Sequence, residues 1–288
     1  MTSGWIILDK PEGLTSTKAG SIVKRLFKQK KLGHAGTLDP FASGVLPLAL
    51  GEATKVMPYV VSDIKEYEFE ITFGEERDSG DLEGAVTATT EQKPTEEQLR
   101  AIIPNFIGTI TQIPPMYSAL WINGQRAYEL ARRGETVDMK ARQVLIQDLV
   151  LLSFSGKTAV WRVVCGTGTY VRSLGQDLAR AVGSLGYLSK LRRTRVGKFS
   201  LQDAVNIDTL KNNALSLIGR DWLLPIRVVL DDIPAIPVSA QQAVHLRHGR
   251  SIECPGYEGT VLILSDDQEL ALCKADGQQL HPTRVFNL

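Results

Sequence analysis

The chain has 288 residues, of which 43% are hydrophobic and 23% charged, and its formal net charge is +1. These values are typical of a globular protein with one large domain and a smaller one. No run of about 18 apolar residues occurs, which argues against a membrane-spanning helix, and the N-terminus lacks a secretory pattern. We therefore expect a cytoplasmic protein without a membrane partner. The scattered cysteines, Cys165, Cys254 and Cys273, predict reduced, buried thiols and no metal site.

Basic and acidic residues are unevenly distributed along the chain. Residues 18–31 hold six basic and no acidic side chains, and residues 172–198 hold seven basic side chains against one acidic. Residues 63–97 hold twelve acidic side chains against three basic ones. A protein of low net charge that is polarised in this way can present a basic surface to a polyanion. We therefore expect a nucleic-acid partner that contacts the two basic segments.

The first predicted elements lead into a loop rich in glycine and proline. Residues 5–9 predict a short buried strand. Residues 14–17 supply N-caps for a helix whose apolar side chains have helical spacing: Ala19, Ile22, Val23, Leu26 and Phe27. Residues 33–47 contain three glycines and two prolines and predict a shaped loop. Asp39 precedes Pro40, which disfavours helical backbone and predicts a carboxylate held in a fixed direction.

The middle of the chain contains further strands and helices. Residues 66–73 alternate apolar and polar side chains, as a half-buried strand does, and an acidic loop follows at 74–84. A helix begins near Pro94, and Pro104 ends or disturbs it. Residues 143–153 and 158–165 predict a hairpin of two strands, residues 166–170 cap a helix, and residues 191–199 predict a basic strand or loop.

A change in composition near Asp231 predicts a boundary between two domains, 1–230 and 231–288. Residues 231–237 are acidic and contain prolines, as linkers do. A helix near 239–247 and strands at 260–264 and 269–274 then predict a small module. Because so small a module has a thin core, we expect it to lean on the main domain.

Several motifs in the first 200 residues resemble one family, the TruB pseudouridine synthases, which act on the T-loop of tRNA. Residues 33–47 are similar to the catalytic motif, residues 8–13 to the N-terminal motif, and residues 65–67 to the tyrosine motif. The central motif is matched by residues 114–119 together with Gly124, Arg126, Tyr128, Ala131 and Arg132. Residues 165–174 and 191–194 resemble the arginine motif. Three positions depart from the pattern: Trp121 stands where a lysine is usual, and Arg77 and Ser79 stand where threonines are usual.

The resemblance implies both the fold and the activity. It implies an α+β protein in which a mixed, mainly antiparallel sheet with flanking helices precedes a small PUA-like, RNA-binding β-barrel. It implies isomerisation of a flipped-out uridine to pseudouridine at position 55, in the T-loop of tRNA. The partner is then the T-arm of tRNA, and a monomer is expected. No cofactor is expected, because the reaction involves no net redox change and no energy input.

The resemblance also assigns the site residues. Asp39 is the candidate nucleophile and Arg172 its ion-pair partner. Tyr67 would stack on the uracil and accept a proton; the order of bond making stays open. The further substrate-binding candidates are His34, Leu191, Lys10, Tyr170 and Arg192. Of these, Lys10 is expected to support the Asp39 loop.

Two other functions remain open. One is a non-catalytic module that binds or folds RNA, and the other is a guide-RNA-dependent synthase of small ribonucleoproteins. The joint presence of Asp39, Tyr67 and Arg172 favours an enzyme over a binder. The compact length, without basic extensions, favours a stand-alone enzyme. Tyr67 also has a purely structural alternative, since it shares an apolar strand face with Phe69 and Ile71.

Overall fold

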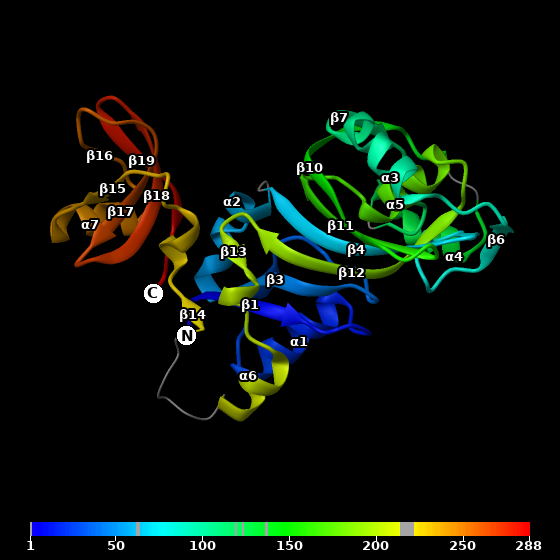
Figure 1. Ribbon diagram of the computed structural model, residues 1–288. Helices are drawn as coiled ribbons and strands as arrows, with labels where there is room; N and C mark the ends of the chain where they lie inside the picture. The colour runs from blue at the N-terminus through cyan, green and yellow to red at the C-terminus, as the bar shows by residue number, and fades with distance from the viewer. Residues whose placement is uncertain (1, 62–63, 119, 123, 136–137, 214–221) are drawn as a thin grey trace.

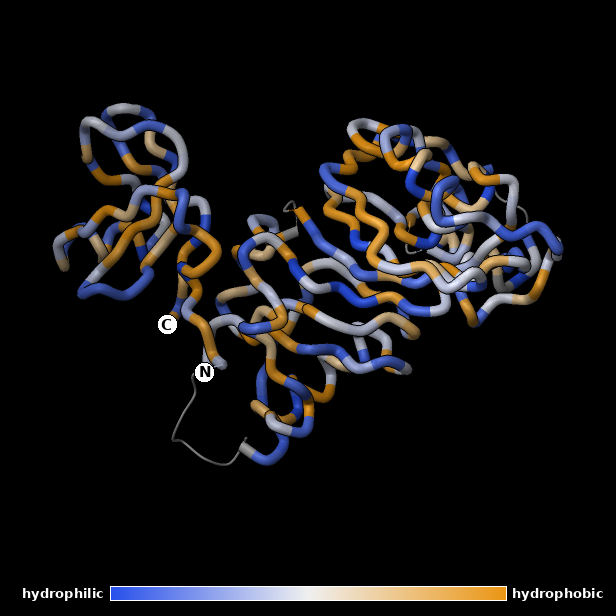
Figure 2. The backbone as a smooth tube through the Cα atoms, viewed as in Figure 1, coloured by the Kyte–Doolittle hydropathy of each residue, from blue (hydrophilic) through white to orange (hydrophobic). Residues whose placement is uncertain are grey.

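The computed structural model describes residues 2–61, 64–118, 120–122, 124–135, 138–213 and 222–288 (Figure 1). Ala119 of the central motif lies outside these residues. The described chain forms a ten-stranded sheet, a five-stranded sheet and two short hairpins. Figure 2 shows hydrophobic segments along the strands of both large sheets. None of the described helices is long and apolar enough to cross a membrane.

The ten-stranded sheet carries the predicted catalytic residues. Its main path runs through β14 (Leu223–Leu224), β1 (Gly4–Lys10), β3 (Ser43–Leu50), β12 (Gly186–Val196), β4 (Lys65–Phe73), β11 (Thr158–Cys165), β10 (Arg142–Phe154) and β7 (Gly108–Gln112). Two further strands join it: β2 (Leu32–His34) pairs with β3, and β13 (Phe199–Ser200) pairs with β12. Every pairing is antiparallel except that of β3 with β12. The expected mixed, mainly antiparallel sheet is confirmed.

Helices flank this sheet, and short pieces connect its strands. The α-helices are α1 (Ser16–Leu26), α2 (Pro58–Val61), α3 (Glu96–Ile102), α4 (Ala127–Arg132), α5 (Val171–Ala181) and α6 (Ile207–Asn213). The 3-10 helices are η1 (Gly51–Val56), η2 (Ile103–Phe106), η3 (Leu201–Asp203) and η4 (Ile226–Val229). The two hairpins are β5 (Glu75–Arg77) with β6 (Val86–Thr89), and β8 (Trp121–Ile122) with β9 (Gln125–Arg126).

Local sequence signals predicted several of these elements correctly. The Thr15 side chain caps α1 by accepting a hydrogen bond from the Lys18 amide. The α3 helix changes to the tighter η2 at Ile103, one residue before Pro104, which has no amide hydrogen. In β4 the odd-numbered side chains are buried and the even-numbered ones face outward, as the alternation predicted.

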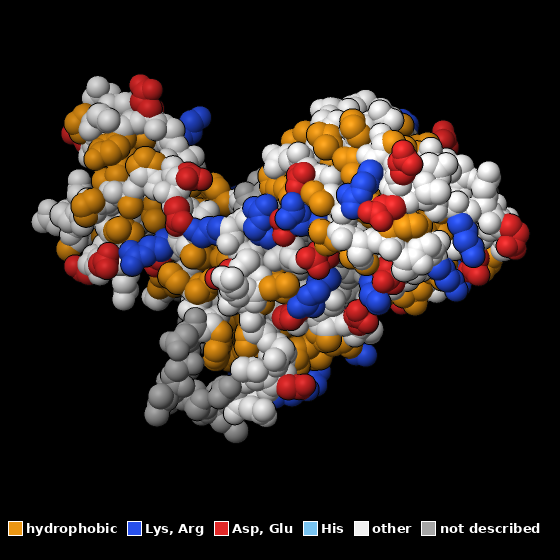
Figure 3. All heavy atoms as spheres, in the orientation of Figure 1, with side chains coloured by type: hydrophobic (Ala, Val, Ile, Leu, Met, Phe, Trp, Pro, Cys, Tyr) orange, Lys and Arg blue, Asp and Glu red, His pale blue; other side chains and the backbone are white. Residues whose placement is uncertain are grey.

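Acidic residues of β4 lie opposite basic residues of β12 where the two strands pair. Glu70 lies opposite Lys190, and their side chains form an ion pair at 3.2 Å. Thr194 donates a hydrogen bond to Glu66, also across these strands. Figure 3 shows basic and acidic side chains interleaved on the visible face. The basic run at 190–198 is therefore not a free cationic stripe.

The C-terminal residues form a second, curled sheet of half-barrel form. Its order is β15 (Ala235–Pro237), β17 (Glu258–Ser265), β18 (Gln268–Asp276), β19 (Gln279–Val285) and β16 (Ile252–Glu253), and it packs with α7 (Ala240–Arg247). The expected linker at 231–237 was wrong in its last three residues, because Ile236 is buried and β15 pairs in parallel with β17. Cys273 and Cys165 are buried free thiols, whereas Cys254 is partly exposed.

The small sheet packs against the main domain next to the N-terminal strands (Figure 1). Leu262, Leu272 and Phe286 belong to the same apolar cluster as Trp5. The Lys55 ammonium donates to the Val285 carbonyl at 2.5 Å. The module therefore leans on the main domain, as its small size predicted.

Candidate active site

The Asp39 loop is anchored at its base by two buried polar side chains. The Ser16 hydroxyl donates to the Leu38 carbonyl at 3.0 Å and accepts from the Leu38 amide at 2.8 Å. The Lys10 side chain is fully buried, and its ammonium donates to the carbonyls of Pro11 (2.8 Å), Leu14 (2.7 Å) and Pro40 (3.3 Å). The contacts at Leu38 and Pro40 are made by the two residues that flank Asp39. They therefore fix the direction of the Asp39 carboxylate.

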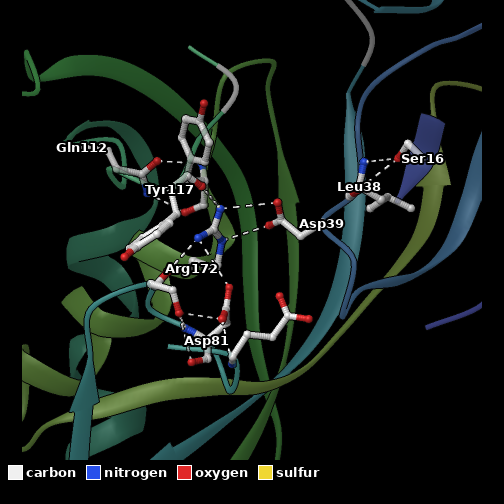
Figure 4. A network of polar contacts seen from close by, with 10 residues as sticks. Ser16, Leu38, Asp39, Asp81, Gln112, Tyr117 and Arg172 are labelled. Carbon is white, nitrogen blue, oxygen red and sulfur yellow. Dashed lines mark hydrogen bonds and ion pairs between the residues drawn. The ribbon is translucent and has the colours of Figure 1, made fainter. Parts of the chain in front are cut away.

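Arg172 lies opposite this carboxylate (Figure 4). Its Nε atom is 2.9 Å from Asp39 Oδ2, and Nη2 donates to Asp39 Oδ1 at 3.4 Å. The other donors of the guanidinium are also held, because Nη1 donates to the Ser79 carbonyl and Nη2 to the Tyr117 carbonyl, each at 2.7 Å. A second carboxylate, Asp81, lies 3.4 Å from Nη1. The fork of the guanidinium is thus fixed, which suits bidentate pairing with a carboxylate.

Asp39 and Arg172 line a cavity of about 300 Å³. The Asp39 side chain is 36% exposed and the Arg172 side chain 4% exposed, so the carboxylate is open to an incoming ligand while its partner is buried. Tyr67, Tyr170 and Leu191 also line the cavity. The structure therefore brings five of the eight predicted site residues to one place.

The alternation of β12 decides which of its arginines faces the cavity. Leu191 and Arg193 line the cavity. Arg192 instead forms an ion pair with Asp9 at 2.8 Å and donates a hydrogen bond to the Ser43 hydroxyl. Arg193 was missed as a site residue by the sequence reasoning. The signal that could have found it is its spacing of two residues from Leu191, which places both side chains on the same face of a strand.

Arg193 is held in place by buried backbone contacts. It is 1% exposed, and it donates to the carbonyls of Val45 at 2.7 Å and Gly36 at 2.9 Å. Gly36 has a φ of +80°, and a Cβ there would lie 3.1 Å from the Arg193 guanidinium. Glycine at this position of the Asp39 loop therefore allows the close approach of the arginine.

Like Arg192, two further predicted substrate contacts, His34 and Lys10, lie outside the cavity lining. His34 ends β2 and is half-buried; its Nδ1 atom makes no hydrogen bond within the described part of the chain. Burial and the charge of Arg193 lower the pKa of His34, which favours its neutral form. Lys10 lies beneath the loop and not among the lining residues. Tyr170 does line the cavity, and the guanidinium of Arg142 lies 4.7 Å from its ring centroid.

Burial shifts the pKa values of the central groups. It raises the pKa of Asp39, against which the positive charges of Arg172 and Lys10 act. It raises the pKa of Tyr67, so the phenol keeps its proton at neutral pH. It lowers the pKa of Lys10 to about 8. The cavity also has Lys65 and Arg193 in its lining, so cations outnumber the single lining carboxylate among the described residues.

A second cavity of about 710 Å³ adjoins the first. Asp39, Arg172 and Ser118 line both, which places the ion pair where the two cavities meet. The N-terminal turn of α1 also lines the second cavity. A long ligand can therefore place one group in the first cavity and extend along the second.

Comparison with known proteins assigns this arrangement to a family. Residues 24–171 match the TruB family pseudouridylate synthase N-terminal domain, and residues 172–230 match the tRNA pseudouridylate synthase B C-terminal domain. A protein of Bradyrhizobium diazoefficiens described as tRNA pseudouridine synthase B is 47% identical, over 99% of this chain and 86% of its own length. A Caulobacter vibrioides protein of the same description is 44% identical, over 99% of this chain and 96% of its own length.

The fold is also similar to that of solved structures. One, described as "Structure of H/ACA RNP bound to a substrate RNA containing 2'-deoxyuridine", superimposes with a TM-score of 0.73 and 24% identity. The match covers 99% of this chain and 85% of that chain. At this identity the likeness establishes the shared fold.

Proposed function

The chain belongs to the TruB family and is a tRNA pseudouridine synthase, an isomerase, and we propose that its substrate is the uridine at position 55 in the T-loop. The observation that carries the proposal is the Asp39–Arg172 ion pair at the meeting point of the two cavities. It supplies an oriented carboxylate beside a space that can hold an extruded base. The adjoining cavity leaves room for the rest of the loop.

The reaction rearranges bonds within one nucleotide. The N1–C1′ bond breaks and a C5–C1′ bond forms; C5 loses a proton, and N1 ends with one. Asp39 acts as the nucleophile, at the base or at C1′, and is regenerated when C5 joins C1′. We assign the stacking of the uracil to Tyr67 and Leu191, which line the cavity.

Tyr67 is also the group that we propose to relay the C5 proton. It is 9% exposed, and burial raises the pKa of its hydroxyl, so it enters the reaction as a phenol. It can accept the C5 proton only while it releases its own proton, which we assign to N1, the ring atom that ends the reaction protonated. Arg193, which acts against this rise in pKa, stabilises the negative charge that develops on the phenol or the base.

We assign most of the electrostatic RNA binding to the basic segment 18–31 and less to the segment 172–198. All six basic side chains of residues 18–31 are exposed, and none forms an ion pair within the described chain. We assign backbone phosphates to this surface, which begins at the second cavity. The small C-terminal sheet adds contacts to a helical stem, read by its shape and 2′-hydroxyls.

Tritium release tests the proposal directly. A tRNA transcript labelled at uracil C5 should lose tritium to water when it is incubated with the protein. A matched transcript with cytidine at position 55 should lose none. Release from both transcripts at equal rates would refute the choice of position 55, and release from neither would refute catalysis on this substrate and favour an RNA binder.

A further inference from the structure

The β8–β9 hairpin presents an aromatic ring at the surface beside the active site. Trp121 is 63% exposed, whereas Trp5 and Trp161 are fully buried and Trp222 is packed against Phe27. A single exposed apolar side chain is ordinary in proteins. The surroundings of Trp121 distinguish it from that ordinary case.

The first distinguishing observation is a cation–π contact. Trp121 and Arg126 are directly opposite in the hairpin, so their side chains lie on one face. The Arg126 guanidinium carbon lies 4.3 Å from the centroid of the Trp121 ring. The ring is thus steadied by its cross-strand neighbour, and most of its surface stays open to solvent.

The second observation is the position of the hairpin. Leu120 and Ser118 line the catalytic cavity, and Trp121 is the next residue after Leu120. The Ala127 amide donates to the Leu120 carbonyl at 2.8 Å, and the Tyr128 amide donates to the Ser118 carbonyl at 3.1 Å. These bonds tie the hairpin and the start of α4 to the cavity wall.

From this geometry, and resting on the proposed function, we propose that Trp121 is a stacking platform for an unpaired nucleobase next to the target uridine. Leu120 lines the cavity and Trp121 does not, so the indole lies outside the cavity at its edge. A base neighbouring the extruded uridine meets the open face of the indole. An aromatic face flanked by arginine suits any base, because every base has a π-face.

The expected effect of the platform is on binding and not on chemistry. Trp121 does not touch the reacting uridine, so its replacement should raise the KM and the Kd and leave the kcat unchanged. Loss of one base–aromatic stack should weaken RNA binding by about 5- to 150-fold. The fluorescence of Trp121 should also be quenched when RNA binds, because its indole is exposed and the other tryptophans are not.

The test compares three variants of the full chain, Trp121→Ala, Trp121→Phe and Trp121→Lys, on a T-arm hairpin and on a single-stranded RNA. Alanine should weaken binding to both RNAs, and phenylalanine should recover much of the affinity. Lysine should recover affinity only at low salt, with a log–log salt slope steeper by roughly 0.7–0.9, because it replaces a stack by a phosphate contact. Tyr59→Ala is the control, since Tyr59 is an exposed aromatic residue that lines neither of the two cavities at Asp39.

The outcomes separate this proposal from the proposed function. If the wild-type protein releases tritium but the alanine variant binds RNA as tightly as the wild type, the platform is refuted and the enzyme function stands. Equal weakening by alanine and phenylalanine, or by the Tyr59 control, also refutes it. Another outcome is that the wild type releases no tritium while the affinities of the variants for single-stranded RNA still follow the predicted order. In that case the platform stands and the choice of reaction fails.

Discussion

The Nε atom of Arg172 lies 2.9 Å from Asp39 Oδ2, and this ion pair joins two residues that are 133 positions apart in the chain. Arg172 is the second residue of α5, and Asp39 lies in the loop before β3. Both residues line the cavity that also contains Tyr67 and Leu191, and both line the adjoining cavity. A small change at either residue is therefore expected to affect catalysis before it affects the fold.

Replacing Asp39 by asparagine should abolish turnover while leaving the fold and the RNA affinity nearly intact. Asparagine has almost the same shape but cannot act as an anionic nucleophile. Tritium release measures the loss, with circular dichroism and a filter-binding assay on the same preparation as controls. Substantial release by the purified variant would show that Asp39 is not the nucleophile.

The Arg172→Lys variant should be strongly impaired although the positive charge is kept. Lysine cannot hold Asp39, Ser79 and Tyr117 at once with the planar geometry of the guanidinium. We expect a fall in kcat of roughly 10- to 100-fold, the loss that follows when a residue that orients a metal ligand is replaced. The comparison variant is Arg180→Lys, because Arg180 pairs with Glu76 at the exposed end of α5. Wild-type turnover by Arg172→Lys would reduce Arg172 to a phosphate contact.

The activity should fall both below and above its optimum pH, for two different reasons. Burial raises the pKa of Asp39, so the acid limb should lie above the range of an ordinary aspartate. Burial lowers the pKa of Lys10 to about 8. Above that pH the neutral amine has too few hydrogens for its three carbonyl partners, and the loop loses a support.

Stability should not follow the alkaline loss of activity. Because folding lowers the pKa of Lys10, the unfolded chain binds more protons above pH 8, and this group then favours the folded state as the pH rises. Thermal unfolding and initial rates measured at the same pH values test this divergence. In Lys10→Met the alkaline limb should vanish and the acid limb should move upward, since a charge that lowers the pKa of Asp39 is gone. An unchanged profile in that variant would remove Lys10 from the explanation.

The salt dependence of RNA binding should arise from α1 and not from β12. Lys24→Gln removes an exposed cation of α1, and the slope of log K against log salt should become shallower by roughly 0.7–0.9. Lys190→Gln is the matched control, because Lys190 already pairs with Glu70. Equal changes in both variants would show that the β12 run also reaches phosphates.

A fragment ending at Asp231 should separate affinity from chemistry. All the assigned catalytic residues precede this position, so a folded fragment should still convert a bare T-arm hairpin at saturating concentration, with weaker tRNA binding. The fragment should be less stable, by about 1.5–3 kcal/mol for each large apolar side chain removed, because Leu262, Leu272 and Phe286 pack on the main domain. Circular dichroism checks folding first. A folded fragment with unchanged affinity would remove the RNA-binding role from the small sheet, and a folded but inactive one would place part of the site beyond Asp231.

The elements that depend on neighbouring residues could be predicted from the sequence. The cap at Thr15 and the alternation of β4 are local, because helix and strand periodicity act over a few residues. The Asp39 loop was also visible as a cluster of glycine and proline, and the family motifs pointed to Asp39 and Arg172. The short strand β15 was hidden inside an apparent linker, because its pairing with β17 is not a local property.

Only the tertiary structure decided which side chains meet. It placed Asp81 beside Arg172 and chose Arg193 over Arg192 for the cavity, because the face of a strand depends on its register with its neighbours. It also paired Glu70 of β4 with Lys190 of β12, although composition had suggested separate acidic and basic surfaces. Sequence thus determined the chemistry available and the local elements. Contacts between residues far apart in the chain determined the site, since long-range packing sets distances that no local pattern contains.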